Sequence, residues 1–249
     1  MKHRKKLLTS LFAVAGLLLA GSVWANGSGL GIAGSPHDFT DGTSSEAGGA
    51  VDETWNARKE ICRVCHVPHD HQLATQRYTN GLLWNHGVSS ATYTMYSSST
   101  LNGTQSASPD GTAKLCLGCH DGTVAINTFD KYPDATHPEV GNITTIYSGK
   151  VKAFQVPSFT DGANLDLRGT HPISITYDAT ADTKLNPTTN TMGTSGKIAD
   201  VLDNGKVQCS SCHDVHDQES VSGTHLLRVA QTVAQGGTAS GLCLTCHKK

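Results

Sequence analysis

Large apolar residues are concentrated in one segment near the start of the chain. A basic cluster at residues 2–6 precedes an apolar run from Leu7 to Val23, and Val23 and Ala25 stand where a signal peptidase reads small residues. This three-part pattern predicts a secretory signal peptide over residues 1–25, and the polar interruptions of the run favour cleavage over a retained membrane anchor. No later segment approaches the roughly 20 apolar residues that span a bilayer. We therefore expect a secreted protein with no membrane span after signal removal.

Beyond residue 25 the chain is rich in glycine, serine and threonine. The segments Ser97–Thr112 and Thr176–Gly196 contain few large apolar side chains. By apolar content alone, residues 26–249 would form a marginally stable globule. Either much of this chain is disordered, or something other than side chains fills its interior.

The charge balance narrows the function classes. Removing the four basic residues of the signal segment from the total of 19 leaves 15 Lys and Arg against 21 Asp and Glu, a net charge of −6. An acidic chain without a basic cluster is a poor candidate for nucleic-acid binding.

All eight cysteines belong to four copies of one motif, Cys-x-x-Cys-His. The cysteine pairs are Cys62 and Cys65, Cys116 and Cys119, Cys209 and Cys212, and Cys243 and Cys246, followed by His66, His120, His213 and His247. This is the attachment signature of c-type haem. The two thiols form thioethers with the haem vinyl groups, and the next imidazole is the proximal iron ligand. The sequence therefore predicts four covalently bound haem c groups.

Disulfides, structural zinc and redox dithiols also use paired cysteines. None of them requires a histidine after every second cysteine. With 13 histidines in 249 residues, four such coincidences have a probability on the order of 10⁻⁵. Four haems would supply the missing interior. The expected fold class is thus a multihaem cytochrome c, mostly irregular loop with short helices at the motifs, few short strands, and the haem stack as its core.

The sixth iron ligand is expected to be histidine. Beyond the initiator the only methionines are Met95 and Met192, and a methionine ligand would raise the reduction potential. Eight histidines remain outside the signal segment and the motifs: His37, His69, His71, His86, His137, His171, His216 and His225. Four bis-histidine haems would be closed to substrate, which suits electron transfer and argues against an enzyme.

An internal repeat selects among these histidines. In each half of the chain a histidine precedes a motif, a second follows three residues after the proximal ligand, a Leu-Leu pair comes next, and another motif ends the unit. The repeat predicts two two-haem modules, residues 26–135 and 136–249, within one continuous haem-wrapped unit. Histidines at equivalent positions of the repeat are the favoured distal ligands, and there are four of them with one alternate. A histidine three residues past its own proximal ligand is placed to cap a neighbouring haem. The four are His37, His69, His171 and His216, and the alternate is His86.

Several short motifs carry a resemblance to a known family. They are Ser35–Phe39, Cys65–His69, Leu83–His86, Leu115–Thr123, His171–Ser174, Cys212–His216 and Leu242–His247, in this order. The chain resembles the tetrahaem outer-surface c-type cytochromes of metal-reducing bacteria, particularly the filament-forming outer-membrane cytochrome E type. The resemblance implies a continuous chain of stacked bis-histidine haems in a homopolymer, or nanowire, at the outer cell surface. It also implies that one haem is capped from the neighbouring subunit, for which His37 is the favoured donor, and that redox partners or metal oxides receive the electrons.

Two other functions remain open from the sequence. A monomeric periplasmic or surface tetrahaem shuttle would share the same haem chemistry and differ only in its contacts between subunits. A multihaem reductase would need one iron with an open coordination site, which the supply of histidines disfavours.

Overall fold

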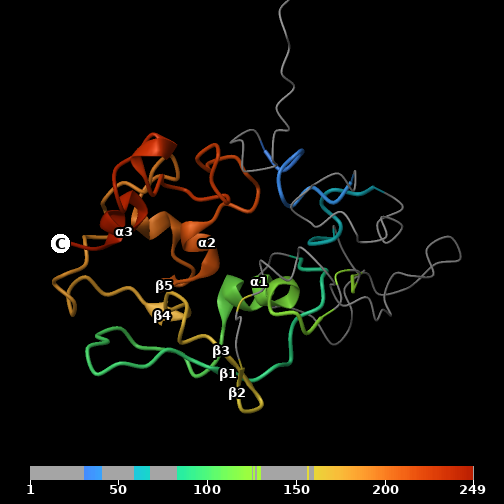
Figure 1. Ribbon diagram of the computed structural model, residues 1–249, viewed down its shortest axis with the longest axis horizontal. Coiled ribbons are helices and arrows are strands. Elements are labelled where there is room, and N and C mark those ends of the chain that lie inside the picture. The colour runs from blue at the N-terminus through green and yellow to red at the C-terminus, as the bar shows by residue number, and fades with distance from the viewer. Residues whose placement is uncertain are drawn as a thin grey trace, which may run out of the picture.

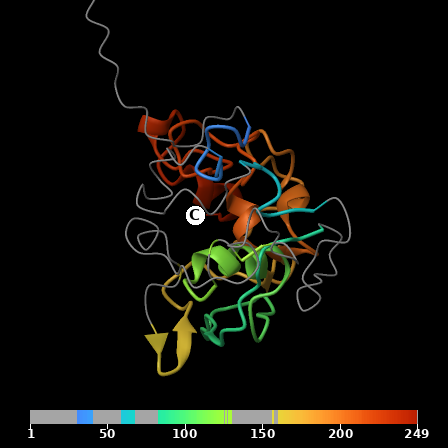
Figure 2. The same ribbon diagram turned by 90° about the vertical axis from the view of Figure 1, so that its right-hand side faces the viewer.

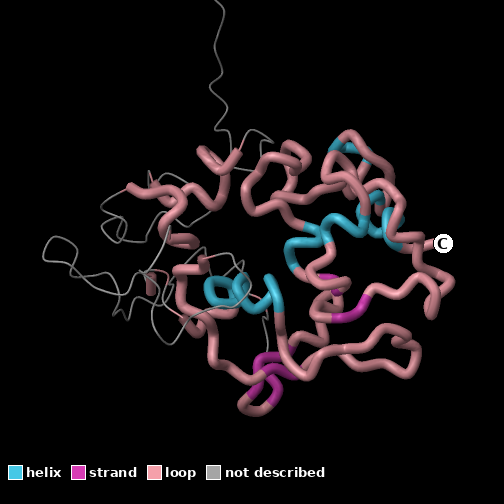
Figure 3. The backbone as a smooth tube through the Cα atoms, turned by 180° about the vertical axis from the view of Figure 1, so that it is seen from behind, coloured by secondary structure: helices cyan, strands magenta, loops and turns pink. Residues whose placement is uncertain are grey.

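The computed structural model describes residues 31–40, 59–67, 83–124, 126, 128–129, 156 and 160–248. The predicted signal peptide, the distal candidate His69 and the boundary between the predicted modules lie outside these residues. Within them the backbone consists mostly of loops and turns, interrupted by short helices and strands (Figure 3).

The regular elements are all short. In chain order they are β1 (Tyr93–Thr94), α1 (Gly111–His120), β2 (Thr160–Asp161), β3 (Asn164–Asp166), β4 (Ile175–Thr176), η3 (Ile198–Val201), β5 (Lys206–Val207), α2 (Cys209–Cys212), η4 (Val233–Gln235) and α3 (Gly241–Cys246). Strands of two or three residues do not form a stable sheet alone. The fold of the described residues therefore depends on what their loops pack against.

The two small sheets join segments that are distant in the sequence. Strand β3 pairs in parallel with β1 and antiparallel with β2, with Leu165 opposite Tyr93 on one side and opposite Thr160 on the other. Strands β4 and β5 form an antiparallel pair, with Ile175 opposite Val207. In Figures 1 and 2 the three-stranded sheet lies below α1, and α2 lies on the other side of α1. The pairing of β1 with β3 thus connects the first half of the chain to the second.

Buried apolar side chains are sparse, as Gly-, Ser- and Thr-rich sequence requires. Among the described residues, Val64, Ile126 and Phe129 form one buried cluster, with Phe39 and Cys65 packed against it. Val64 lies between the cysteines of the first motif, so this cluster is built directly around a motif.

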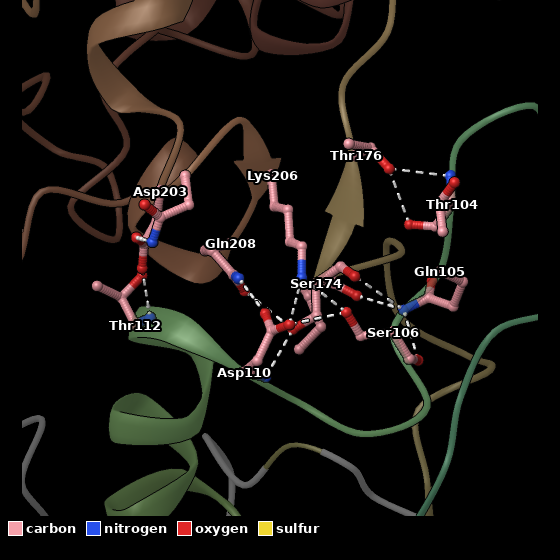
Figure 4. A network of polar contacts seen from close by, with 12 residues as sticks. Thr104, Gln105, Ser106, Asp110, Thr112, Ser174, Thr176, Asp203, Lys206 and Gln208 are labelled. Carbon is pink, nitrogen blue, oxygen red and sulfur yellow. Dashed lines mark hydrogen bonds and ion pairs between the residues drawn. The ribbon is translucent and has the colours of Figure 1, made fainter. Parts of the chain in front are cut away.

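A polar network joins the start of α1 to the second half of the chain (Figure 4). Asp110, the residue before α1, accepts hydrogen bonds from Lys206 Nζ (2.5 Å), Ser106 Oγ (2.7 Å) and Gln208 Nε2 (2.8 Å). Its own N–H donates to Ser174 Oγ (2.9 Å). The pKa of the Asp110 carboxyl is lowered, because these donors outweigh the opposing effect of burial. The network fixes the start of α1 beside the start of α2.

Candidate haem-binding sites

The Cys-x-x-Cys-His motifs share one local geometry. In three of them the histidine N–H donates to the carbonyl of the first cysteine: His66 to Cys62 (2.8 Å), His213 to Cys209 (3.0 Å) and His247 to Cys243 (2.9 Å). The fourth motif, Cys116–His120, is the last part of α1. A helical turn places residues three and four apart on the same face. Each motif therefore presents its two thiols and its imidazole on one side of a short helical turn.

None of the eight cysteines forms a disulfide. Burial raises the pKa of Cys65 to about 12 and that of Cys119 to about 12. Cys62 and Cys243, the first cysteines of the first and last motifs, are exposed, and the other six are partly buried. The exposed thiols thus belong to the two motifs at the ends of the series.

Thiols of successive motifs lie close together. Burial is the largest cause of the raised pKa of Cys65, and the electrostatic effect of Cys119 in the second motif is the next largest. A hydrogen bond between Cys209 and Cys116 is the main cause of the raised pKa of Cys209. The pKa of Cys212 is raised to about 11 by burial and then by Cys246 of the last motif. In Figure 1 the four motif segments follow one another across the molecule in the order of the sequence. They are the cyan segment at residues 59–67, then α1, α2 and α3.

Three of the four predicted distal histidines lie opposite motif histidines. Each pair joins segments that are distant in the sequence, and the separations between ring centroids fall within 0.2 Å of one another. The pairs are His37 with His120 (6.1 Å, planes at 83°), His66 with His216 (6.3 Å, 23°) and His171 with His247 (6.2 Å, 60°).

This common separation fits two imidazoles that bind one metal from opposite sides. An imidazole nitrogen binds a metal at about 2.0 Å and lies about 1.1 Å from the centre of its ring, so such ring centres are about 6.2 Å apart. Ring pairs in direct contact have centroids about 4.5–7 Å apart, with offset-stacked and edge-to-face arrangements both allowed. The separation of the three histidine pairs is nearly constant while their planes range from 23° to 83°. The rings of His37 and Phe39 have the same separation (6.2 Å, 73°), so it also occurs in direct ring packing.

His37 lies in a histidine-rich environment. Its pKa is lowered to about 4, first by burial and then by the positive charges that His120, His213 and His216 would carry. The Val215 backbone opposes this shift, but no hydrogen bond of normal geometry reaches Nδ1, which is buried without a partner within the described chain. The ring is therefore neutral at neutral pH, and the neutral form is the one that binds metals.

Trp84 is a second residue with an unsatisfied buried donor. Its ring packs edge-on against His66, with centroids 5.7 Å apart. Its indole Nε1 has no hydrogen-bond partner in the parts of the chain that are described. Buried polar groups are normally paired. A group with acceptor atoms beside His66, such as a haem with its carboxylates, would satisfy this donor, so these residues fit the expected cofactor.

The remaining histidines of the prediction differ in position. His213 Nδ1 lies 2.8 Å from the carbonyl oxygen of His225, and burial lowers the pKa of His213. The fourth predicted distal ligand, His69, lies outside the described residues. The alternate ligand His86 is fully buried, and its two ring nitrogens each lie 2.9 Å from a backbone carbonyl oxygen, those of Gly87 and Ile126. The structure therefore does not bring His86 opposite a motif histidine.

The surroundings of the first and third motifs repeat each other. Cys65 accepts a hydrogen bond from the Asn85 N–H (2.8 Å), and Cys212 accepts one from the Arg228 N–H (2.9 Å). Two residues before each donor, a leucine has a positive φ: Leu83 at 50° and Leu226 at 58°. By these contacts Leu83 is equivalent to Leu226. The sequence favours an alignment of Leu82-Leu83 with Leu226-Leu227, which differs from this register by one position. Sequence reasoning did not single out Asn85 and Arg228. Aligning the two halves in this corrected register would have placed them at equivalent positions.

Among the described residues no helix is long and apolar enough to cross a membrane. No group of three or more His, Cys, Asp or Glu side chains there is arranged to hold a metal ion without a further ligand.

Neither a comparison with protein-family models nor a comparison with curated proteins finds a match for this chain.

Proposed function

We propose that this chain is a tetrahaem c-type cytochrome that transfers electrons through four bis-histidine haems and catalyses no reaction of its own. The observation that carries the proposal is the set of three histidine pairs at 6.1–6.3 Å, each of which combines a motif histidine with a predicted distal histidine. When bound, haem c supplies a one-electron ferric/ferrous couple.

The residues that would hold each haem follow from the motifs and the pairs. The cysteines of each motif form the thioether links and its histidine is the proximal ligand. His216, His37 and His171 are the distal ligands for the first, second and fourth motifs. By the repeat, the counterpart of His66 with His216 is His213 with His69, so we assign His69 to the third motif. The first and third motifs then exchange distal ligands between the modules.

The chain's own residues act on these sites in three ways. The short helical turns aim two thiols and an imidazole to one side. Burial keeps His37 neutral and hence able to bind iron. The polar network around Asp110 holds the second and third motifs together, so that thiols Cys116 and Cys209 are in contact. Close, fixed spacing between redox groups is what electron transfer requires of a protein.

The resemblance extends the proposal to a secreted homopolymer at the outer cell surface that conducts electrons to redox partners or metal oxides. One observation favours a second candidate, the monomeric shuttle. His37, the expected donor to a neighbouring subunit, lies opposite His120 of its own chain. An intrachain pair needs no second subunit. In either assembly the exposed Cys62 and Cys243 mark the ends of the motif series.

The proposal is tested on protein matured in a cytochrome c-producing host. Intact mass should show the processed chain plus four haems, and pyridine haemochrome absorbance should give four haem c per chain. Oxidised protein should be entirely low-spin, and redox titration should give four potentials below that of the hydrogen electrode. Fewer than four haems, or one potential well above zero, would contradict the assignment. Electron microscopy of material sheared from producing cells then separates filament from monomer.

A further inference from the structure

Arg228 holds several parts of the chain around the third motif. Its guanidinium Nε donates to the carbonyl of Ser210, inside the motif (3.0 Å). Nη1 donates to Ser195 Oγ (2.8 Å) and to Glu219 Oε2 (2.6 Å). Its backbone N–H donates to the carbonyl of Cys212 (2.9 Å). With a side chain only 13% exposed, Arg228 is a buried cation with most of its donors used.

Asp214 completes this cluster and directly follows the proximal histidine His213. Its Oδ1 lies 3.8 Å from Arg228 Nη2. The same carboxylate accepts hydrogen bonds from the N–H groups of His216 (3.2 Å), Gln218 (2.7 Å) and Glu219 (2.7 Å). These three hydrogen bonds fix the loop that begins at His213 and carries His216.

At the first motif the positions equivalent to Arg228 and Asp214 are occupied by uncharged residues. Asn85 occupies the position of Arg228, and its side-chain Nδ2 donates to the carbonyl of Arg63 (2.5 Å) as Arg228 Nε does to Ser210. Val67 occupies the position of Asp214, because its N–H donates to Leu83 as that of Asp214 donates to Leu226. The hydrogen bond to the motif is thus present in both described clusters, and at the third motif the two equivalent positions are charged.

We infer that Arg228 is a positioning residue that fixes the motif turn before His213 directly and, through Asp214, the loop that carries His216. These two histidines belong to different haems, since His216 lies opposite His66 of the first motif. Arg228 therefore couples the geometry of the haem sites at the first and third motifs. It also adds a positive charge beside the third motif that partly balances Asp214 and Glu219. This inference rests on the proposed function.

The test compares variants of the four-haem protein. Arg228→Asn imports the residue of the first module, keeps one amide donor for Ser210 and removes the charge. Arg228→Lys keeps the charge but lacks the planar fork that reaches several acceptors at once. Lys197→Met, which removes an exposed positive charge outside the cluster, is the matched control. Each variant is measured by EPR of the oxidised protein and by spectroelectrochemical titration.

Wild-type protein should show a rhombic low-spin signal from the near-parallel pair of His66 and His216. In both Arg228 variants this signal should shift or broaden, while the signals of the steeply crossed pairs stay unchanged. In Arg228→Asn one haem should also shift to lower potential, because two carboxylates near the third motif lose their counter-charge. In Arg228→Lys the potentials should stay close to those of wild type. Lys197→Met should change neither measurement.

Unchanged EPR signals in both Arg228 variants would overturn the inference, as would a shift of equal size in the control. If Arg228→Asn cannot be isolated, Arg228→Lys decides alone through the rhombic signal. The outcome that defeats the proposed function is different. In that case the wild-type protein itself would lack four haems or would lack any rhombic bis-histidine signal.

Discussion

Removing His216 should convert one haem, and only the haem at the first motif, from low-spin to high-spin. His216 is the ring opposite His66, at 6.3 Å between centroids, so alanine at position 216 leaves that iron with five protein-and-porphyrin ligands. One of four motifs is affected, so total low-spin ferric intensity should fall by about one quarter, given that axial ligation sets the spin state.

The ring planes determine which EPR signal is lost. Near-parallel imidazoles split the iron d orbitals strongly and give a rhombic signal, whereas crossed planes leave the orbitals nearly degenerate and give one large g value. The planes of His66 and His216 are at 23°, while the other two described pairs are at 60° and 83°. The intensity lost in His216→Ala should therefore come from the rhombic signal, and the large-g signals should persist.

The control is His225→Ala, which removes another exposed imidazole from the same segment and keeps the backbone carbonyl that contacts His213. It should leave all four haems low-spin. His216→Met offers an independent readout, because methionine ligation should raise one potential, by on the order of 0.1 V within the range that axial ligands span. If His216→Ala retains its full low-spin intensity, or loses it from the large-g signals, the pairing of His66 with His216 is wrong.

Three further outcomes are expected. Asp110→Asn should lower the free energy of unfolding by about 1–2 kcal/mol, a value reduced for partial solvent exposure, as measured by denaturant titration of the holoprotein. Gly118→Ala should reduce haem loading at the second motif, measured by peptide mass mapping, because a Cβ would overlap the backbone carbonyl of Gly87, whereas Gly169→Ala meets nothing and should load normally. The pKa values of Asp110 and Asp214 are both lowered by folding, so their stabilisation is complete above the unfolded pKa of about 4 and is lost as pH falls further. Melting curves from pH 6 to pH 2 should show this loss, with a smaller slope in Asp110→Asn.

The parts of the site that follow local spacing could be predicted from the sequence. Two thiols and a histidine at positions i, i+3 and i+4 need one helical turn, and that turn is present at each motif. The repeat selected His37, His171 and His216 as candidates, and the ring of each lies 6.1–6.3 Å from the ring of a motif histidine. Which histidine faces which motif could not be read, because the pairs join residues that are between 76 and 150 positions apart.

Long-range polar contacts were equally hidden from sequence reasoning. Asp110 and Lys206 are ordinary surface residue types, and nothing in their sequence neighbourhoods indicates that they meet across 96 positions. Arg228 and Asn85 differ chemically, so a search for identical residues does not align them. Only their shared hydrogen bonds to the cysteine carbonyls show that they occupy the same place in the repeat. The position of His86 was hidden in the same way, since nothing in its sequence context indicates that its ring nitrogens lie beside the carbonyls of Gly87 and Ile126 and near Cys119 Sγ.

In the proposed assignment each predicted module completes one site of its own, with His37 near His120 and His171 near His247, but other contacts join the two modules. His216 of the second module faces His66 of the first, and β1 of the first module pairs with β3 of the second. The Asp110 network and the contact between Cys116 and Cys209 cross the same boundary.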